Sequence, residues 1–211
     1  MEEGLKRYEK PYLPQEPVVC FDEKPGPLQA EVGPPIAARP GKPAQRDGEY
    51  NRCGTANVFC AVEPLAGRHF RWPAPNRSGV QFAKAIQRLT EPYPLARTIH
   101  LVVDHLSPHS CKILVDHFGP QPGVALCKRF TVHYTPKHAS WLNQAEIEIS
   151  LFARQCFGKR RIPSLSVLQA ACRAWNRRIN RDRTTIHCKF TRRDARRVFH
   201  YQHNLFTRSQ H

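Results

Sequence analysis

Short runs of apolar residues, separated by polar segments, recur along the chain and predict buried β-strands. Five segments have this pattern, at residues 18–21, 55–62, 68–72, 98–103 and 129–134. Runs of this length, bounded by polar or turn-forming residues, are typical of strands. The turn sequence Pro64–Gly67 separates the second run from the third, so we expect these two strands to form a hairpin.

Apolar residues at intervals of three and four predict helices between and after these strands. Within residues 140–157, the apolar positions that share one helix side are Leu142, Ala145, Ile149, Phe152 and Cys156. Further helices are expected at residues 78–89, 110–118 and 164–180, and Thr191 with Asp194 resembles a capping box for a last short helix. The order of elements indicates an α/β fold, a mixed sheet flanked by helices.

Two segments lack either pattern. Residues 1–16 are polar, and we interpret them as a lead-in or the remnant of a linker. Residues 24–53 are rich in Pro, Gly, Arg and Lys, and a long irregular stretch inside a domain is usually functional or mobile. We therefore expect one domain over residues 17–199, followed by a tail at residues 200–211.

The charge of the chain is strongly positive, with 33 Lys and Arg against 17 Asp and Glu, a formal balance of +16. So large an excess repels itself unless a polyanion neutralises it. No apolar run approaches the length of a membrane span, and the N-terminus lacks the basic-then-apolar order of a signal peptide. We expect a soluble protein of the cytoplasm with a nucleic-acid partner and no membrane partner.

The eight cysteines are scattered along the chain, and no Cys-x-x-Cys pair occurs. Most lie in apolar runs, as in Val19–Phe21 and Phe59–Ala61. We expect small buried residues in a reducing compartment rather than disulfides or zinc ligands.

Two of the predicted strands end in an aspartate, Asp22 and Asp104. If these strands are parallel neighbours, both carboxylates lie at one edge of the sheet. Two unpaired carboxylates raise one another's pKa, and a divalent cation such as Mg²⁺ or Mn²⁺ between them removes that cost. Aspartate also ends strands and begins turns for purely structural reasons, so the pattern alone leaves both interpretations open.

A third carboxylate would strengthen the interpretation as a metal site. Glu146 lies at the edge of the apolar stripe of the 140–157 helix, whereas Glu148 lies well away from the centre of that stripe. The sequence Asn143–Glu146 also fits a helix-capping pattern, which is the structural alternative for Glu146. Glu23 follows Asp22 directly and would face the opposite side of its strand, so it is the poorer ligand.

The three blocks of sequence around these carboxylates have a recognisable form. The first is Val18-Val-Cys-Phe-Asp22-Glu-Lys-Pro25, and the second is Leu101-Val-Val-Asp104-His-Leu-Ser-Pro-His109. The third and most specific is Phe130-Thr-Val-His-Tyr-Thr-Pro136 followed by Ser140-Trp-Leu-Asn-Gln-Ala-Glu146. They resemble the catalytic blocks of bacterial insertion-sequence transposases of the mariner-related group, and the resemblance covers about residues 15–199.

The resemblance implies an RNase H-like fold and a DDE active site that holds two divalent ions, Mg²⁺ or Mn²⁺. The catalytic and metal-binding residues of the family fall on Asp22, Asp104 and Glu146. The implied reaction is metal-dependent cleavage of a DNA strand at a transposon end, followed by transfer of the freed 3′-hydroxyl to target DNA. No covalent protein–DNA intermediate is needed.

Two departures from the family pattern stand out. The second block usually carries Asn after its Asp, and here that position is His105. The gap between Asp104 and Glu146 holds 146 − 104 − 1 = 41 residues, a few more than is usual. We expect the extra length in a loop near Gly119–Gly123, where it costs little.

Basic residues expected to contact DNA phosphates lie in two groups, one in the irregular stretch and one after the 140–157 helix. They are Arg39, Lys42 and Arg46 in the first group, and Lys159, Arg160, Arg161, Arg177 and Arg178 in the second. Charge runs are also common on solvated surfaces, which is the alternative interpretation of both groups.

Relatives in this group carry helix-turn-helix domains upstream, and no such signal precedes residue 17. We therefore expect a separately encoded helix-turn-helix half as one partner. The other expected partners are double-stranded DNA, both at transposon ends and at the target, and a second copy of the chain in a homodimer. The expected location is the bacterial nucleoid. The alternative function is a truncated, inactive transposase remnant that binds DNA without cutting. A third is an RNase H-like nuclease acting on RNA or branched DNA.

Overall fold

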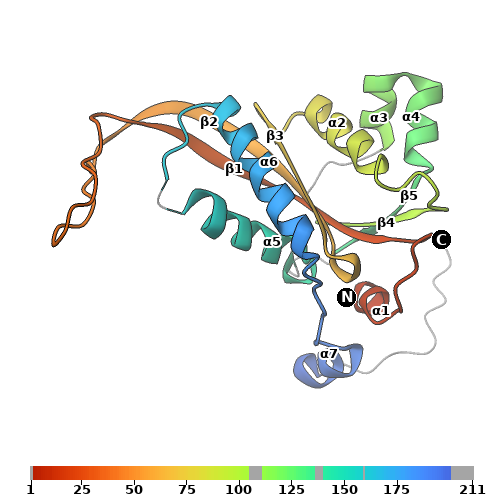
Figure 1. The fold of residues 1–211 in the computed structure, drawn as a ribbon. Coiled ribbons are helices and arrows are strands. Elements are labelled where there is room, and N and C mark those ends of the chain that lie inside the picture. The colour runs from red at the N-terminus through yellow and green to blue at the C-terminus, as the bar shows by residue number, and fades with distance from the viewer. Residues whose placement is uncertain (1, 105–110, 136–139, 159, 201–211) are drawn as a thin grey trace.

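The computed structural model describes residues 2–104, 111–135, 140–158 and 160–200, and five strands of this part form one sheet (Figure 1). The strands are β1 (Val18–Glu31), β2 (Tyr50–Glu63), β3 (Arg68–Ala74), β4 (Ile99–Val103) and β5 (Phe130–Tyr134). Their order is β3-β2-β1-β4-β5. The pairs β1–β2 and β2–β3 are antiparallel, whereas β1–β4 and β4–β5 are parallel. This confirms the predicted mixed sheet, including the hairpin of β2 and β3.

Helices cover both faces of this sheet (Figure 1). They are α1 (Glu2–Tyr8), α2 (Gly79–Thr90), α3 (Cys111–Phe118), α4 (Pro120–Cys127), α5 (Ala145–Phe152), α6 (Leu165–Asp182) and α7 (Arg192–Phe199). Short 3-10 turns at Pro64–Ala66 and Ser140–Leu142, and one π-helical turn at Ala153–Phe157, complete the set. Helices α2, α5, α6 and α7 fall where the hydrophobic pattern predicts them, and Thr191 with Asp194 forms the predicted capping box.

The two faces of the sheet have separate apolar cores because successive strand residues point to opposite sides. Phe21 and Phe59 lie in the cluster beneath α2, together with Ile86. Cys60 lies in the cluster beneath α5 and α6, together with Trp175. Neighbouring positions of one strand therefore belong to different layers, and this alternation decides which face each carboxylate occupies.

The segment expected to be irregular is instead a long β-hairpin arm, residues 24–53, which extends β1 and β2 beyond the rest of the sheet (Figure 1). Asp22 consequently lies inside β1 and not at its end. Pro25 and Pro27 are tolerated because β4 pairs with β1 only as far as Cys20, so one side of the strand has no neighbour here. The prolines suggested a loop, but they mark an edge strand.

Contacts with the segment after α5 hold the base of the arm. The Arg161 guanidinium forms an ion pair with Glu31 and donates to the carbonyl of Asp47 at 2.8 Å. The Gln29 amide donates to the carbonyl of Ile162 at 2.8 Å. The arm is therefore fastened at its base, while its tip is exposed.

Residues 1–16 contain a packed helix, which the interpretation as a polar lead-in missed. Leu5 of α1 is fully buried and packs in a cluster with Leu142 and Ala195. The Tyr8 hydroxyl donates to the carbonyl of Leu142 at 2.8 Å. One apolar residue per helical turn is too weak a pattern to predict α1 from the sequence.

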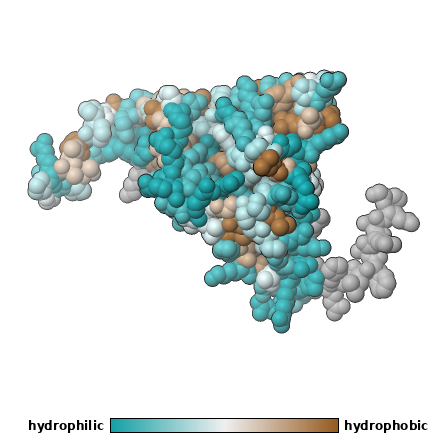
Figure 2. Space-filling view, turned by 45° about the vertical axis from the view of Figure 1, so that its right-hand side comes forward, coloured by the Kyte–Doolittle hydropathy of each residue, from teal (hydrophilic) through white to brown (hydrophobic). Residues whose placement is uncertain are grey.

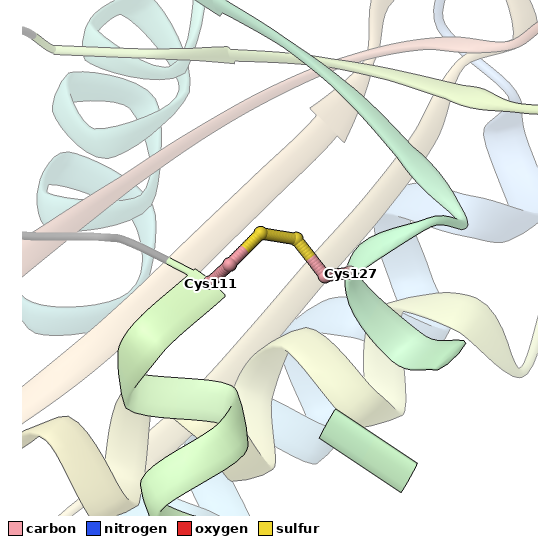
Figure 3. Close-up of a disulfide and its surroundings, with 2 residues drawn as sticks. All are labelled: Cys111 and Cys127. Carbon is pink, nitrogen blue, oxygen red and sulfur yellow. A yellow bond between two sulfur atoms is a disulfide. The ribbon is translucent and has the colours of Figure 1, made fainter. Parts of the chain in front are cut away.

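Residues 119–123, where a loop was expected to hold the extra length between Asp104 and Glu146, lead into and begin helix α4 instead. Helix α4 packs so closely on α3 that a Cβ atom added to Gly123 would lie 2.5 Å from the Cα of Val115. A disulfide joins Cys111, at the start of α3, to Cys127, at the end of α4 (Figure 3). The prediction that cysteines form no disulfide is thus wrong for this pair, because the helical hairpin brings together residues that are distant in sequence. Four others, Cys20, Cys60, Cys156 and Cys172, are buried as expected.

Helix α6 covers the outer edge of the sheet. The Asn180 side chain accepts from the amide of His69 at 2.8 Å and donates to the carbonyl of His69 at 2.7 Å. Asn176 donates to the carbonyl of Arg71 at 3.2 Å. Two asparagines one helical turn apart therefore occupy the hydrogen-bonding positions that a further strand would take.

The outer surface is mainly hydrophilic on the face shown in Figure 2, with hydrophobic residues gathered in small patches. Within the described ranges, no helix combines the length and the apolar character that a membrane crossing requires.

Candidate active site

Asp22 on β1 and Asp104 directly after β4 belong to neighbouring parallel strands. Cys20 and Val102 form the last pair of the ladder, and each aspartate follows its member of that pair by two residues. Both then share the face of Cys20 and Val102, which pack with Ala145 of α5. The expected neighbouring parallel strands are present, and their carboxylates face α5.

Thr135 fixes the carboxylate of Asp104. Its hydroxyl donates to Oδ1 of Asp104 at 2.6 Å, and its amide donates to the carbonyl of Val103 at 2.9 Å. Thr135 is buried and follows β5 directly. Sequence analysis did not identify it as a site residue, although it lies inside the third recognised block. His105 lies outside the described residues.

Glu146 is exposed in the first turn of α5, the helix that packs over the two aspartates. Asn143 precedes this helix and donates from Nδ2 to the carbonyl of Phe21 at 3.0 Å. Its Oδ1 accepts from the amide of Ala145, the first residue of α5, at 3.2 Å, whereas the N-cap position is Gln144, which makes no side-chain capping bond. No hydrogen bond engages the Glu146 carboxylate among the described residues, which leaves it available to a ligand.

The electrostatics of Asp22 are those of an acid cluster. Burial raises the pKa of Asp22 to about 7, opposed by a hydrogen bond from the Glu23 amide at 2.7 Å and reinforced by the charges of Glu146, Glu23 and Asp104. The three candidate carboxylates are therefore close enough to affect one another.

The competing carboxylates lie elsewhere. Glu148 is buried, contrary to the expectation that it lies away from the apolar stripe, and its Oε2 lies 2.7 Å from Arg71 and 2.9 Å from His69. Burial acts to raise the pKa of Glu148, but the contacts with His69 and Arg71 outweigh burial and lower it. Glu23 faces the other side of β1. Its pKa is raised, chiefly by burial, and the charge of Arg77 opposes that rise.

The donor set of Asp22, Asp104 and Glu146 fits a hard divalent cation, because its oxygen ligands carry charge that no neighbouring cation balances. In the residues that the structure describes, no group of three or more His, Cys, Asp or Glu side chains is close enough to hold a metal ion. The three carboxylates therefore lie in one region of the structure, but they are not arranged to bind one metal ion together.

The predicted DNA-contacting residues that the structure describes occupy four different environments. Arg39, Lys42 and Arg46 are exposed on the arm. Arg160 and Arg178 line one open pocket of about 260 Å³, where Arg178 donates to Gln155 at 2.8 Å. Arg177 is exposed on α6, whereas Arg161 is committed to the base of the arm, with 7% of its side chain exposed. Lys159 lies outside the described residues.

Comparison with known proteins gives one family and one fold. A family model described as the DDE superfamily endonuclease matches residues 17–169. Among solved structures, the chain is similar to the Mos1 transposase paired-end complex with left transposon end, with a TM-score of 0.54 and 12% identity over 87% of this chain and 57% of that one. It is also similar to the Mos1 strand transfer complex, with a TM-score of 0.54 and 13% identity over 84% of this chain and 53% of that one. No curated protein matches the sequence.

At such identities the likeness to Mos1 transposase concerns the fold, and it confirms the predicted RNase H-like sheet with flanking helices. The chain spans just over half of the length of the Mos1 chains that it matches.

Proposed function

Because the chain belongs to the DDE superfamily endonuclease family, we propose that it is the catalytic domain of a DNA transposase, which cuts a DNA strand at a transposon end and joins the freed 3′ end to target DNA. The observation that carries the proposal is that Asp22 and Asp104 lie on neighbouring parallel strands, each two residues beyond the last pair of the ladder, where the charges of Asp104 and Glu146 both act on Asp22. The similar Mos1 structures are a paired-end complex and a strand transfer complex, which supports the same reaction.

In this proposal Asp22, Asp104 and Glu146 hold two divalent ions, Mg²⁺ or Mn²⁺. When bound, such ions activate a water molecule and stabilise the leaving 3′ oxygen. Thr135 orients Asp104 by occupying Oδ1, which would leave the other carboxylate oxygen to hold a metal. The burial of Asp22 excludes water from one side of the site and strengthens its attraction for cations.

The DNA partner follows from the net charge of +16. We place its phosphates against the exposed arginines and lysine of the arm, against the pocket of Arg160 and Arg178, and against Arg177. The proposed assembly also includes a second copy of the chain and a separately encoded helix-turn-helix half.

The proposal is tested by substituting Asp22→Asn, which keeps the size of the side chain but removes its charge. We expect the variant to bind end-sequence DNA as wild type does and to lose strand nicking in Mg²⁺ by at least about 10³-fold, since a metal ligand is lost. Gel-based nicking and fluorescence anisotropy measure the two properties.

The matched control is Glu91→Gln. Glu91 is an exposed acid at the end of α2, so this variant should cut DNA as wild type does. Equal nicking by Asp22→Asn and wild type would refute the assignment of the site. Binding without cutting by the wild-type chain, in both Mg²⁺ and Mn²⁺, would instead favour the inactive remnant.

A further inference from the structure

Asn143 lies at the junction between the two elements that carry Asp22 and Glu146. Its side chain is almost completely buried, with 1% of the residue exposed. Nδ2 donates to the carbonyl of Phe21, the residue before Asp22, at 3.0 Å. The backbone carbonyl of Asn143 accepts from the amide of Glu146 itself, also at 3.0 Å. One residue thus connects the backbone of Glu146 to the peptide unit that precedes Asp22.

The other end of the side chain fixes its orientation. Oδ1 accepts from the amide of Ala145 at 3.2 Å, in the first turn of α5. Both polar ends of the buried amide are therefore used, one on the helix and one on the strand. Loss of either bond would leave a buried polar group without a partner, which is unfavourable. The side chain therefore has a single favoured position.

The bond to Phe21 also lies at a particular place in the sheet. The ladder between β1 and β4 ends at the pair Cys20 and Val102, one residue before Phe21. Beyond this pair the β1–β4 ladder no longer fixes the position of Asp22 relative to Asp104. The Asn143 side chain binds the backbone of β1 at Phe21, the first residue after the ladder ends.

From this arrangement we propose that Asn143 is a positioning residue, which sets the separation of Glu146 from Asp22 and so determines how well the site takes up a divalent cation. The proposal rests on the proposed function, because it assumes that these carboxylates bind metal. It assigns no contact between Asn143 and the metal or the DNA. Residues that orient metal ligands typically change metal affinity or activity by about 10–100-fold when replaced.

Two variants distinguish the bond of Asn143 to Phe21 on β1 from its bond to Ala145 on α5. Asn143→Ser keeps a side-chain oxygen that can accept from the Ala145 amide, since serine also caps helices, but it lacks the amide group that reaches Phe21. Asn143→Ala loses both bonds. The matched control is Asn180→Ala, which also removes two side-chain bonds to the backbone of a strand, on β3 and away from the carboxylates.

The first measurement is Mn²⁺ binding to the full chain, followed by the electron paramagnetic resonance signal of the free ion. We expect both Asn143 variants to bind Mn²⁺ about tenfold more weakly than wild type, and Asn180→Ala to bind it normally. The second measurement is the Mg²⁺ dependence of single-turnover nicking. The Asn143 variants should need correspondingly more Mg²⁺, while their affinity for DNA stays unchanged.

Wild-type Mn²⁺ affinity in Asn143→Ser would overturn the proposal, and so would an equal loss in Asn180→Ala, because the loss would then follow stability alone. Unfolding of both Asn143 variants under conditions where Asn180→Ala stays folded would show a structural role instead. Asp22→Asn separates this inference from the function on which it rests. If that variant binds Mn²⁺ normally, the metal site itself is misassigned.

Discussion

Asp22 and Glu148 are two shielded carboxylates whose surroundings shift their pKa values in opposite directions. Asp22 is surrounded by other acids, and burial with their charges raises its pKa to about 7. Glu148 contacts Arg71 and His69, which lower its pKa in spite of burial. The surroundings of Asp22 would attract a cation from solution, whereas Glu148 already has the Arg71 guanidinium beside it. The two acids thus differ in environment: Glu148 joins α5 to β3, whereas Asp22 is a ligand only in the proposed site.

The structural role of Glu148 predicts a large loss of stability on its removal. Glu148→Ala leaves the Arg71 guanidinium buried without its partner, and breaking a buried ion pair from one side costs about 3–5 kcal/mol. Urea denaturation measures this loss, and Glu91→Ala, an exposed acid, is the control.

The same ion pair gives a pH dependence with a definite sign. Because the folded pKa of Glu148 is lowered, its contribution is fully present above its unfolded value of about 4.3 and is lost as the pH falls through the folded value. The stability difference between wild type and Glu148→Ala should therefore shrink in acid. A difference that grows below pH 4 would contradict the assignment.

The residues of the site differ in how readily the sequence predicts them. Asp22 and Asp104 can be found from strand patterns, and the resemblance to a family selects Glu146. The burial of Glu148 cannot be found in this way, because its partner Arg71 lies 77 positions away. Thr135 likewise acts through an aspartate 31 positions away. Local periodicity carries no information on such distant pairs.

At the scale of elements, the sequence predicts those with a clear apolar stripe and misses those whose residues suggest loops. Helix α4 begins with Pro-Gln-Pro-Gly, yet proline is well placed in a first helical turn, and Gly123 allows the close approach to α3. The arm was missed for a related reason, since its prolines lie where β1 has lost a neighbour. In both cases tertiary packing overrides the local preference of proline and glycine for loops.

The contact of α4 with α3 predicts the effect of adding one methyl group. Gly123→Ala places a Cβ atom 2.5 Å from the Cα of Val115, a backbone atom that cannot move aside without shifting the helix. We expect a loss of about 1–3 kcal/mol, measured as a lower midpoint of urea unfolding. Gly26→Ala is the control, because an added Cβ there meets no atom within 4 Å. Equal midpoints for the two variants would show that α3 and α4 are less tightly packed than described.

At the scale of the whole molecule, the positive charge is spread over separate surfaces. The arm lies at one extremity (Figure 1) and carries exposed basic residues, while Arg160 and Arg178 line a pocket beside α6. The composition alone predicts a polyanionic partner. It cannot separate Arg161, which fastens the arm, from its neighbour Arg160, because both occur in one basic run.

The pocket of Arg160 and Arg178 predicts a change in the salt dependence of DNA binding. Each phosphate contact that is lost reduces the slope of log affinity against log salt by about 1. The double variant Arg160→Ala with Arg178→Ala should therefore show a slope lower by about 2, measured by anisotropy across a salt series. Lys112→Ala is the control, since this exposed lysine already pairs with Asp116 at 2.7 Å. An unchanged slope in the double variant would exclude the pocket from the DNA path.

The covering of β3 by α6 has a consequence for how the domain can be divided. The region matched by the family model ends at residue 169, near the start of α6, whereas Asn176 and Asn180 lie beyond it. A fragment cut at that boundary would keep all five strands but expose the backbone amides and carbonyls of an outer strand. Such edges pair with one another, so copies of the fragment would join sheet to sheet into aggregates. The smallest unit that remains monodisperse therefore extends at least through Asn180.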